Sequence, residues 1–133
     1  MALQFSAAVR NARLDAIETA IGASAIMKIF DGTLPANVGT ADAGTVVATL
    51  NLPSDWMAAA SAGAKAKSGT WQDASADATG SADYFRVYAS DGTTCHMQGT
   101  VGIGTGDLQV DNTAFAAGQS FTVTGFTINE ANA

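Results

Sequence analysis

The chain has 133 residues, with six Lys and Arg against twelve Asp and Glu, and a formal net charge of −6. That length predicts one domain over residues 1–133, made of a helical segment at 1–22 and a β domain at 23–133. Alanine supplies 28 of the hydrophobic residues, whereas Leu, Ile, Val and Phe together number only 26. The core is therefore modest, and a chain of this kind benefits from burial against neighbours.

Composition and charge exclude several classes of protein. One Cys and one His exclude an internal disulfide framework and make a His/Cys zinc site implausible. A sequence pI of about 4.3 with scattered basic residues argues against nucleic-acid binding. No apolar run approaches the roughly 20 residues that cross a bilayer, and residues 1–6 lack the pattern of a signal peptide. We therefore expect synthesis in a cytoplasm and no membrane partner.

One helix is predicted near the N-terminus. Ser6 can cap it, residues 7–21 contain no Gly or Pro, and Gly22 stands where a left-handed C-cap belongs. Two interpretations stay open: both of its apolar sectors pack on their own domain, or one of them docks on another subunit. The first sector contains Phe5, Val9, Ala12 and Ala16, the second Leu14, Ile17 and Ile21, and Arg10 and Arg13 lie among them with stems that can cover carbon.

Short β segments follow the helix, separated by Gly, Asp and Asn. Strands are predicted at residues 25–30, 45–52, 84–89, 94–101 and 120–129, with a short one marked by Leu108 and Val110. Asp31-Gly32 and Asp91-Gly92 are turn signals. Between Val123 and Phe126 the apolar parity changes, which indicates either a one-residue bulge near Gly125 or a strand covered on both faces. The fold class is thus mainly β, an antiparallel sandwich or jelly-roll-like domain with one N-terminal helix.

Two long stretches carry little pattern. Residues 32–44 are predicted to form an ordered surface loop, and Ser54-Asp55 can cap a short helical turn through Trp56. Residues 65–67 alternate as an edge strand, where lysines discourage unwanted pairing. Loops this long in a small domain are often functional or held by partners.

No residue constellation selects a catalytic chemistry. Cys95 and His96 are adjacent on a predicted strand, so their side chains point to opposite faces and cannot form a dyad. The glycines of residues 102–106 precede a strand rather than a helix, so a turn is expected there in place of a phosphate loop. Asp73, Asp77 and Asp83 do not match an EF-hand. We expect no enzyme activity, no metal and no cofactor.

Trp56 and Trp71 allow three interpretations, namely anchors of the chain's own core, anchors of a protein interface, or a platform on which a small ligand stacks. The sequence leaves all three open.

A family resemblance rests on three segments. Residues 8–18 (AVRNARLDAIE), 52–60 (LPSDWMAAA) and 65–71 (KAKSGTW) resemble small virion structural proteins of tailed bacteriophages and prophages, and the likeness extends through Phe126-Thr127-Ile128. These segments match no catalytic motif. The resemblance implies a virion structural protein, and the matching residues do not separate head from tail.

The expected function is that of a capsid decoration, or cement, protein that binds and stabilises the major capsid protein lattice. It would act as a homo-oligomer on the virion, on the head surface in this interpretation, after synthesis in the bacterial host cytoplasm. The alternative is a tail or tail-tip module that binds a receptor or glycan beside neighbouring tail proteins. The predicted interface residues are Phe5, Val9, Arg10, Arg13, Leu14, Ile17, Trp56 and Trp71.

Overall fold

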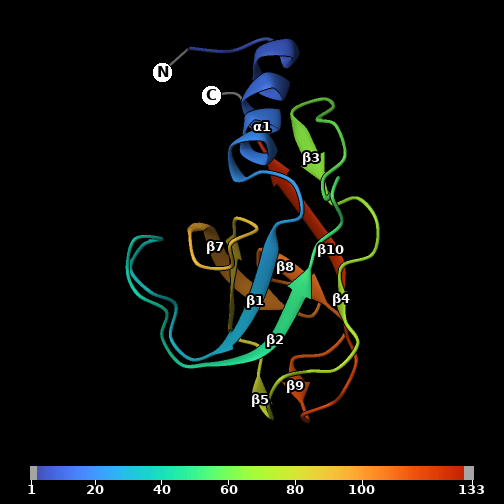
Figure 1. Ribbon diagram of the computed structural model, residues 1–133. Helices are drawn as coiled ribbons and strands as arrows, with labels where there is room; N and C mark the ends of the chain where they lie inside the picture. The colour runs from blue at the N-terminus through green and yellow to red at the C-terminus, as the bar shows by residue number, and fades with distance from the viewer. Residues whose placement is uncertain (1–2, 131–133) are drawn as a thin grey trace.

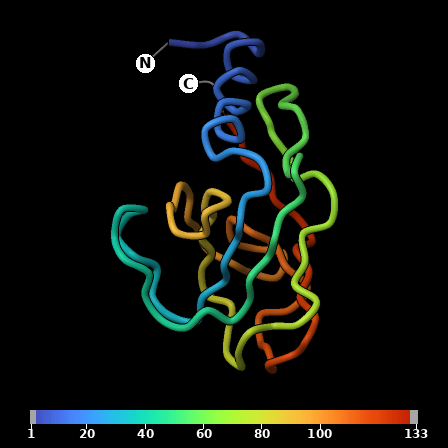
Figure 2. Tube along the Cα trace, viewed as in Figure 1, coloured from blue at the N-terminus to red at the C-terminus, as the bar shows by residue number. Residues whose placement is uncertain are grey.

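A computed structural model describes residues 3–130. Within them the chain forms one helix and ten strands, which are α1 (Ala7–Ile21), β1 (Ile26–Asp31), β2 (Thr45–Asn51), β3 (Ala64–Ala66), β4 (Gln72–Asp73), β5 (Gly80–Ser81), β6 (Tyr84–Tyr88), β7 (Cys95–Gly102), β8 (Leu108–Val110), β9 (Ala114–Phe115) and β10 (Phe121–Asn129). The mainly β class with one N-terminal helix is confirmed. The helix sits at one end of the β domain, where the described part of the chain also begins and ends (Figures 1 and 2).

The helix begins and ends where the sequence predicts. The Ser6 hydroxyl accepts a hydrogen bond from the Val9 amide at 3.3 Å, which satisfies one of the unpaired N–H groups of the first turn. Gly22 has a φ of +95°, and its N–H donates to the Glu18 carbonyl at 2.8 Å. A side chain at this φ would be strained, so glycine ends the helix.

The strands form one large sheet and one small one. The order in the large sheet is β2-β1-β6-β7-β8-β10-β3, with β4 also paired to β10, and the small sheet pairs β5 with β9. The pairs are antiparallel except β7 with β8, which run parallel over two residue pairs. The prediction of a wholly antiparallel sheet is wrong at this point. A five-residue link, residues 103–107, joins those two strands, and within it Gly104 and Gly106 adopt positive φ values that favour glycine.

The large sheet curls, in a sandwich-like arrangement, so that its inner face surrounds the main core. The predicted irregularity in the last strand is a bulge, since the register of β10 against β8 shifts between Val123 and Gly125. It brings apolar residues on either side of the shift into the same core. The aromatic members of this core are Trp56, Trp71, Phe85, Phe115, Phe121 and Phe126, and its aliphatic members include Met27, Ile29 and Leu50.

A second, smaller core lies on the other face of the sheet. Every residue of β6 is buried, because the strand is covered on both faces. Phe30 and Tyr84 stack with ring centroids 4.7 Å apart, and Tyr88 completes the cluster. The loop of residues 32–44 is attached to this region, since the Ala43 amide donates to the Tyr84 hydroxyl at 3.1 Å. It is the ordered surface loop that the sequence predicts.

The segment of residues 53–71 differs from the prediction. No helical turn follows Ser54-Asp55; Met57 instead forms an isolated antiparallel bridge with Lys67. The predicted edge strand is present as β3, which ends the sheet beside β10. Its Lys65 side chain, however, is only 2% exposed. The Lys65 ammonium contacts carboxylates of α1, so this lysine binds the helix and does not prevent pairing at an exposed strand edge.

Candidate functional site

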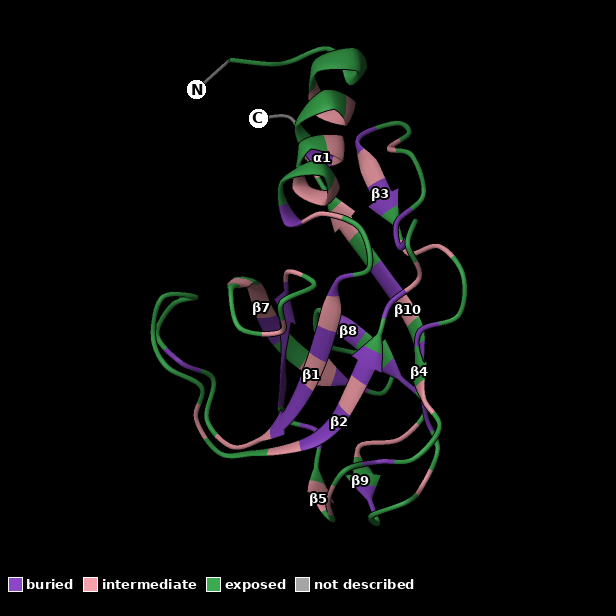
Figure 3. Cartoon of the chain, viewed as in Figure 1, coloured by how far each residue is buried: buried purple, intermediate pink, exposed green. Residues whose placement is uncertain are grey.

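The two apolar sectors of α1 have different surroundings. Leu14 and Ile21 are buried against the β domain, and Ile17 packs on the edge of the main core. The first sector faces outward, with Phe5 40% and Val9 44% exposed, and Ala12 and Ala16 exposed as well. The second sector therefore serves the chain's own fold. We call the part of the first sector that lies on α1 the outer helix stripe, defined as Val9, Ala12 and Ala16 (Figure 3).

The polar side of α1 is tied to the 57–65 hairpin. The Asp15 carboxylate accepts hydrogen bonds from the Ala60 amide at 2.9 Å and from the Lys65 ammonium at 2.8 Å, and Glu18 lies 3.0 Å from the same ammonium. Burial by itself would lower the pKa of Lys65, but its hydrogen bonds to both carboxylates outweigh burial and raise that pKa. The helix is thereby held in one orientation with its outer stripe exposed.

The two arginines hold the end of β10 beside the helix. Arg13 pairs with the Glu130 carboxylate at 2.8 Å, and its guanidinium lies 5.3 Å from the centre of the Phe5 ring. Arg10 donates to the Glu130 carbonyl at 3.2 Å, while its Nε is buried without a hydrogen-bond partner among the described residues. Arg13 is thus accessible at the border of the outer helix stripe, whereas Arg10 has a structural role.

Both tryptophans lie wholly inside the core, with no exposed surface. Their rings are 5.9 Å apart, and the Trp71 ring also contacts Phe126. The Trp56 indole donates to the Gly22 carbonyl at 2.9 Å. Neither ring is available to a partner or a stacking ligand on the surface, so their assignment to an interface was wrong, and so was that of the buried Leu14. The sequence could not decide this, because it does not say which loop closes over which aromatic ring.

A buried polar network fixes the 32–44 loop, and the sequence analysis did not identify it. The Arg86 guanidinium, 2% exposed, lies 2.7 Å from the Asp42 carboxylate and also donates to Gln98 and to the Asn37 carbonyl. Asp42 accepts from the Tyr88 hydroxyl at 2.6 Å. Burial would raise the pKa of Asp42, but hydrogen bonds from Tyr88 and Arg86, together with the Arg86 charge, lower it below its usual value.

The candidate chemical groups have structural roles in this fold. Cys95 is half-buried and donates to the Met97 carbonyl, and burial raises the pKa of its thiol, while the neighbouring His96 is exposed. Asp73 accepts from the Thr49 amide and Asp77 from the Thr49 hydroxyl. Among residues 3–130 no group of three or more His, Cys, Asp and Glu is placed to hold a metal ion.

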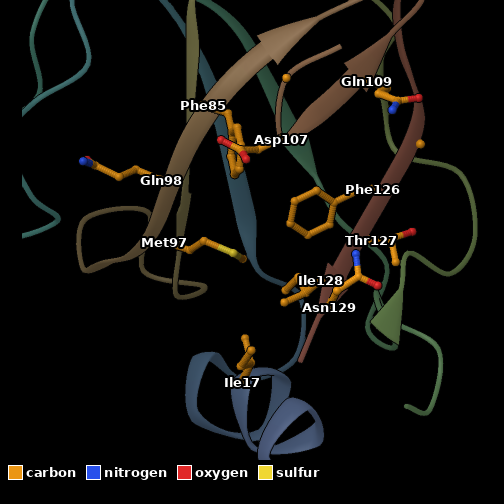
Figure 4. A pocket seen from close by; sticks show the side chains of 12 residues that line it. Ile17, Phe85, Met97, Gln98, Asp107, Gln109, Phe126, Thr127, Ile128 and Asn129 are labelled. Atoms are coloured by element: carbon orange, nitrogen blue, oxygen red, sulfur yellow. The ribbon is translucent and has the colours of Figure 1, made fainter. Parts of the chain in front are cut away.

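A cleft of about 680 Å³ opens between α1 and the sheet, and the sequence analysis did not identify it. Ile17 forms one end, Met97 and Gln98 of β7 one wall, and Phe126 to Asn129 of β10 the other (Figure 4). Asp107 closes the far end, where it accepts hydrogen bonds from Thr100. The lining is mixed: Ile17, Met97, Phe126 and Ile128 contribute apolar surface, and Gln98, Gln109, Thr127 and Asn129 contribute polar surface. Asp107 is the only charged residue among those that line the cleft. No short motif marks it, because its walls come from segments about 30 to 110 residues apart in the chain.

No helix in the part of the chain that the structure describes is long and apolar enough to span a membrane. Comparison with known proteins gives no match to any family model, to any curated protein or to any solved structure.

Proposed function

We propose that this chain is a non-enzymatic structural protein of a tailed-phage virion, which decorates the head by binding the lattice of the major capsid protein. The observation that carries the proposal is the outer helix stripe, together with the sequence resemblance described above. Exposed apolar patches bordered by polar residues often mark interaction surfaces, so the stripe favours burial in an assembly.

The surroundings of the stripe support this role. Val9 and Ala12 stand on a helix whose opposite side is fixed by the buried Lys65 and by Leu14. A rigidly placed surface loses little conformational entropy on binding, so more of the contact energy appears as affinity. Binding of the folded state alone also stabilises a chain whose own core is modest.

The proposal is tested by counting copies of the protein in purified particles of the phage that carries its gene. The informative variant is Val9→Asp, which places a charge in the stripe. Asp at this third helical position favours the helix dipole, so folding is preserved. The matched control is Val38→Asp in the 32–44 loop, because Val38 is 41% exposed, close to the 44% of Val9.

Quantitative mass spectrometry should find the wild-type protein and the Val38→Asp variant at hundreds of copies per particle. The Val9→Asp variant should fall at least about tenfold, since a buried unpaired charge costs more than the 1.4 kcal/mol that corresponds to this factor. Absence of the wild-type protein from particles, or normal incorporation of Val9→Asp, would overturn the proposal. A count of only a few copies per particle would place the protein in the tail, as in the alternative interpretation.

A further inference from the structure

The cleft lies between β7 and β10, beyond the end of the short strand that separates them in the sheet. Strand β8 lies between these two strands, but it has only three residues and pairs with β7 solely at Val101 and Gly102. On the other side it reaches β10 no further than Phe126. Beyond β8, within residues 3–130, the facing edges of β7 and β10 pair with no strand. The 680 Å³ cleft occupies this position (Figure 4).

Backbone groups of β7 and β10 point toward the cleft from both walls. On β7, the Thr100 amide and carbonyl point toward β8 and bond to Asp107. Backbone groups point in the same direction at every second residue of a strand, so the Gln98 amide and carbonyl point that way too. On β10, the Phe126 carbonyl and the Glu130 amide bond on the β3 side, at Lys67 and Gly63. By alternation, the backbone groups of Thr127 and Asn129 point into the cleft. Such facing edges are a template for an added strand.

The side chains of the cleft indicate what that strand carries. Met97, Phe126 and Ile128 point to the same side of the sheet as Ile17 of α1, and all four contribute apolar surface. A strand placed between β7 and β10 would therefore bury every second side chain against carbon. The complementary sequence is short, extended, uncharged and apolar at alternate positions.

We propose that this cleft accepts residues 3–5 of a second copy of the chain as an added β-strand. Leu3 and Phe5 are 55% and 40% exposed, and they lie two residues apart, so both face the same side of an extended segment. Gln4 between them is uncharged, as the cleft rim requires. The segment precedes the helix and runs away from the β domain (Figure 1).

The inserted strand comes from a second copy, because residues 3–5 of the same molecule do not reach the cleft. Ile17 lines the cleft, and Ser6, where the helix is capped, is eleven residues away along α1, or about 16 Å at 1.5 Å per residue. Leu3 lies three residues before Ser6, which spans about 10 Å when extended. Insertion in the same molecule would therefore require the helix to unwind.

Such an exchange joins two different surfaces, so it can repeat from copy to copy and gives either a closed ring or an open filament. The inference rests on the proposed function, since it names a second copy of the chain as one partner in the assembly. It can be wrong while the proposed function is right.

The first test compares Gln4→Pro with Gln4→Ala in the full chain by sedimentation velocity. Proline removes the backbone N–H at the centre of the added strand, whereas alanine keeps it. Self-association should weaken about fivefold or more for Gln4→Pro, as expected for one lost hydrogen bond, and stay within twofold of wild type for Gln4→Ala. Equal association of both variants, or a wild-type chain that stays monomeric at millimolar concentration, would overturn the inference.

The second test is disulfide trapping in a Cys95→Ala background. Full chains carrying Phe5→Cys are mixed with chains carrying Ile128→Cys, and Ile103→Cys is the control acceptor because Ile103 is 60% exposed and lies outside the cleft. The first mixture should give at least about tenfold more heterodimer than the control. Equal yields would reject strand exchange. If particles still carry hundreds of copies while trapping fails, only this inference is lost and the proposed function stands.

Discussion

The buried guanidinium of Arg86 predicts a specific cost for removing its counter-ion. Asp42→Asn keeps the size of the side chain and one acceptor oxygen, but it leaves the Arg86 charge unpaired. Breaking a fully buried ion pair by removing one partner costs about 3 to 5 kcal/mol, and a fully exposed pair is worth up to about 1 kcal/mol. Arg86 is 2% exposed and Asp42 is 41% exposed, so this pair lies between the two limits. We expect Asp42→Asn to lower the free energy of unfolding by about 2 kcal/mol, between these limits.

Urea denaturation at pH 7 measures this change, and Asp77→Asn is the matched control. Asp77 accepts one hydrogen bond from Thr49 at 2.7 Å and forms no ion pair within the described residues. Its substitution should stay within about 0.5 kcal/mol of wild type. Hydrogen exchange at the Ala43 amide, which bonds to Tyr84, should quicken only in Asp42→Asn. A loss below about 0.5 kcal/mol, or one equal to that of the control, would refute the assignment of this network as the anchor of the loop.

Two further predictions concern the same face of the sheet. Burial raises the pKa of the Tyr88 hydroxyl, as does its hydrogen bond to Asp42. The unfolded chain therefore releases this proton at a lower pH than the folded chain, and the free energy of unfolding should fall as pH rises above about 10. In Tyr88→Phe the fall should be shallower, and an unchanged slope would contradict the assignment. Gly44 has a φ of +84°, and a Cβ there would lie 2.0 Å from the Asp31 carbonyl oxygen. Gly44→Ala should therefore lower Tm by several degrees in calorimetry. Gly104 has a φ of +68° but open space around it, so Gly104→Ala should lower Tm less.

Local chemistry made the helix and most strands predictable. Ser6 fixes the start of α1 through its side chain and Gly22 fixes the end through its backbone N–H. The parity change near Gly125 indicates either a bulge or a strand covered on both faces, and the structure shows the bulge. These features depend on neighbours in the chain. The order of the strands depends instead on distant pairing, so the sequence contains no sign that β8 would run parallel to β7.

The candidate site was predictable only in part, for the same reason. The outer helix stripe follows from helical spacing, which places Val9 and Ala12 on one side wherever the helix lies. Helical spacing does not predict that the stripe is exposed, because exposure depends on which sector of the helix the β domain covers. Arg86 and Lys65 show the limit most clearly. Charged residues are expected at the surface, yet both are buried, since carboxylates from remote segments meet them.

The bond from the Trp56 indole to the Gly22 carbonyl has a mechanical consequence. It joins the last turn of α1 to the middle of the core, in parallel with the contacts of Asp15 and Glu18 on the hairpin. The C-terminal end of the helix is therefore expected to move together with the core and not independently of it.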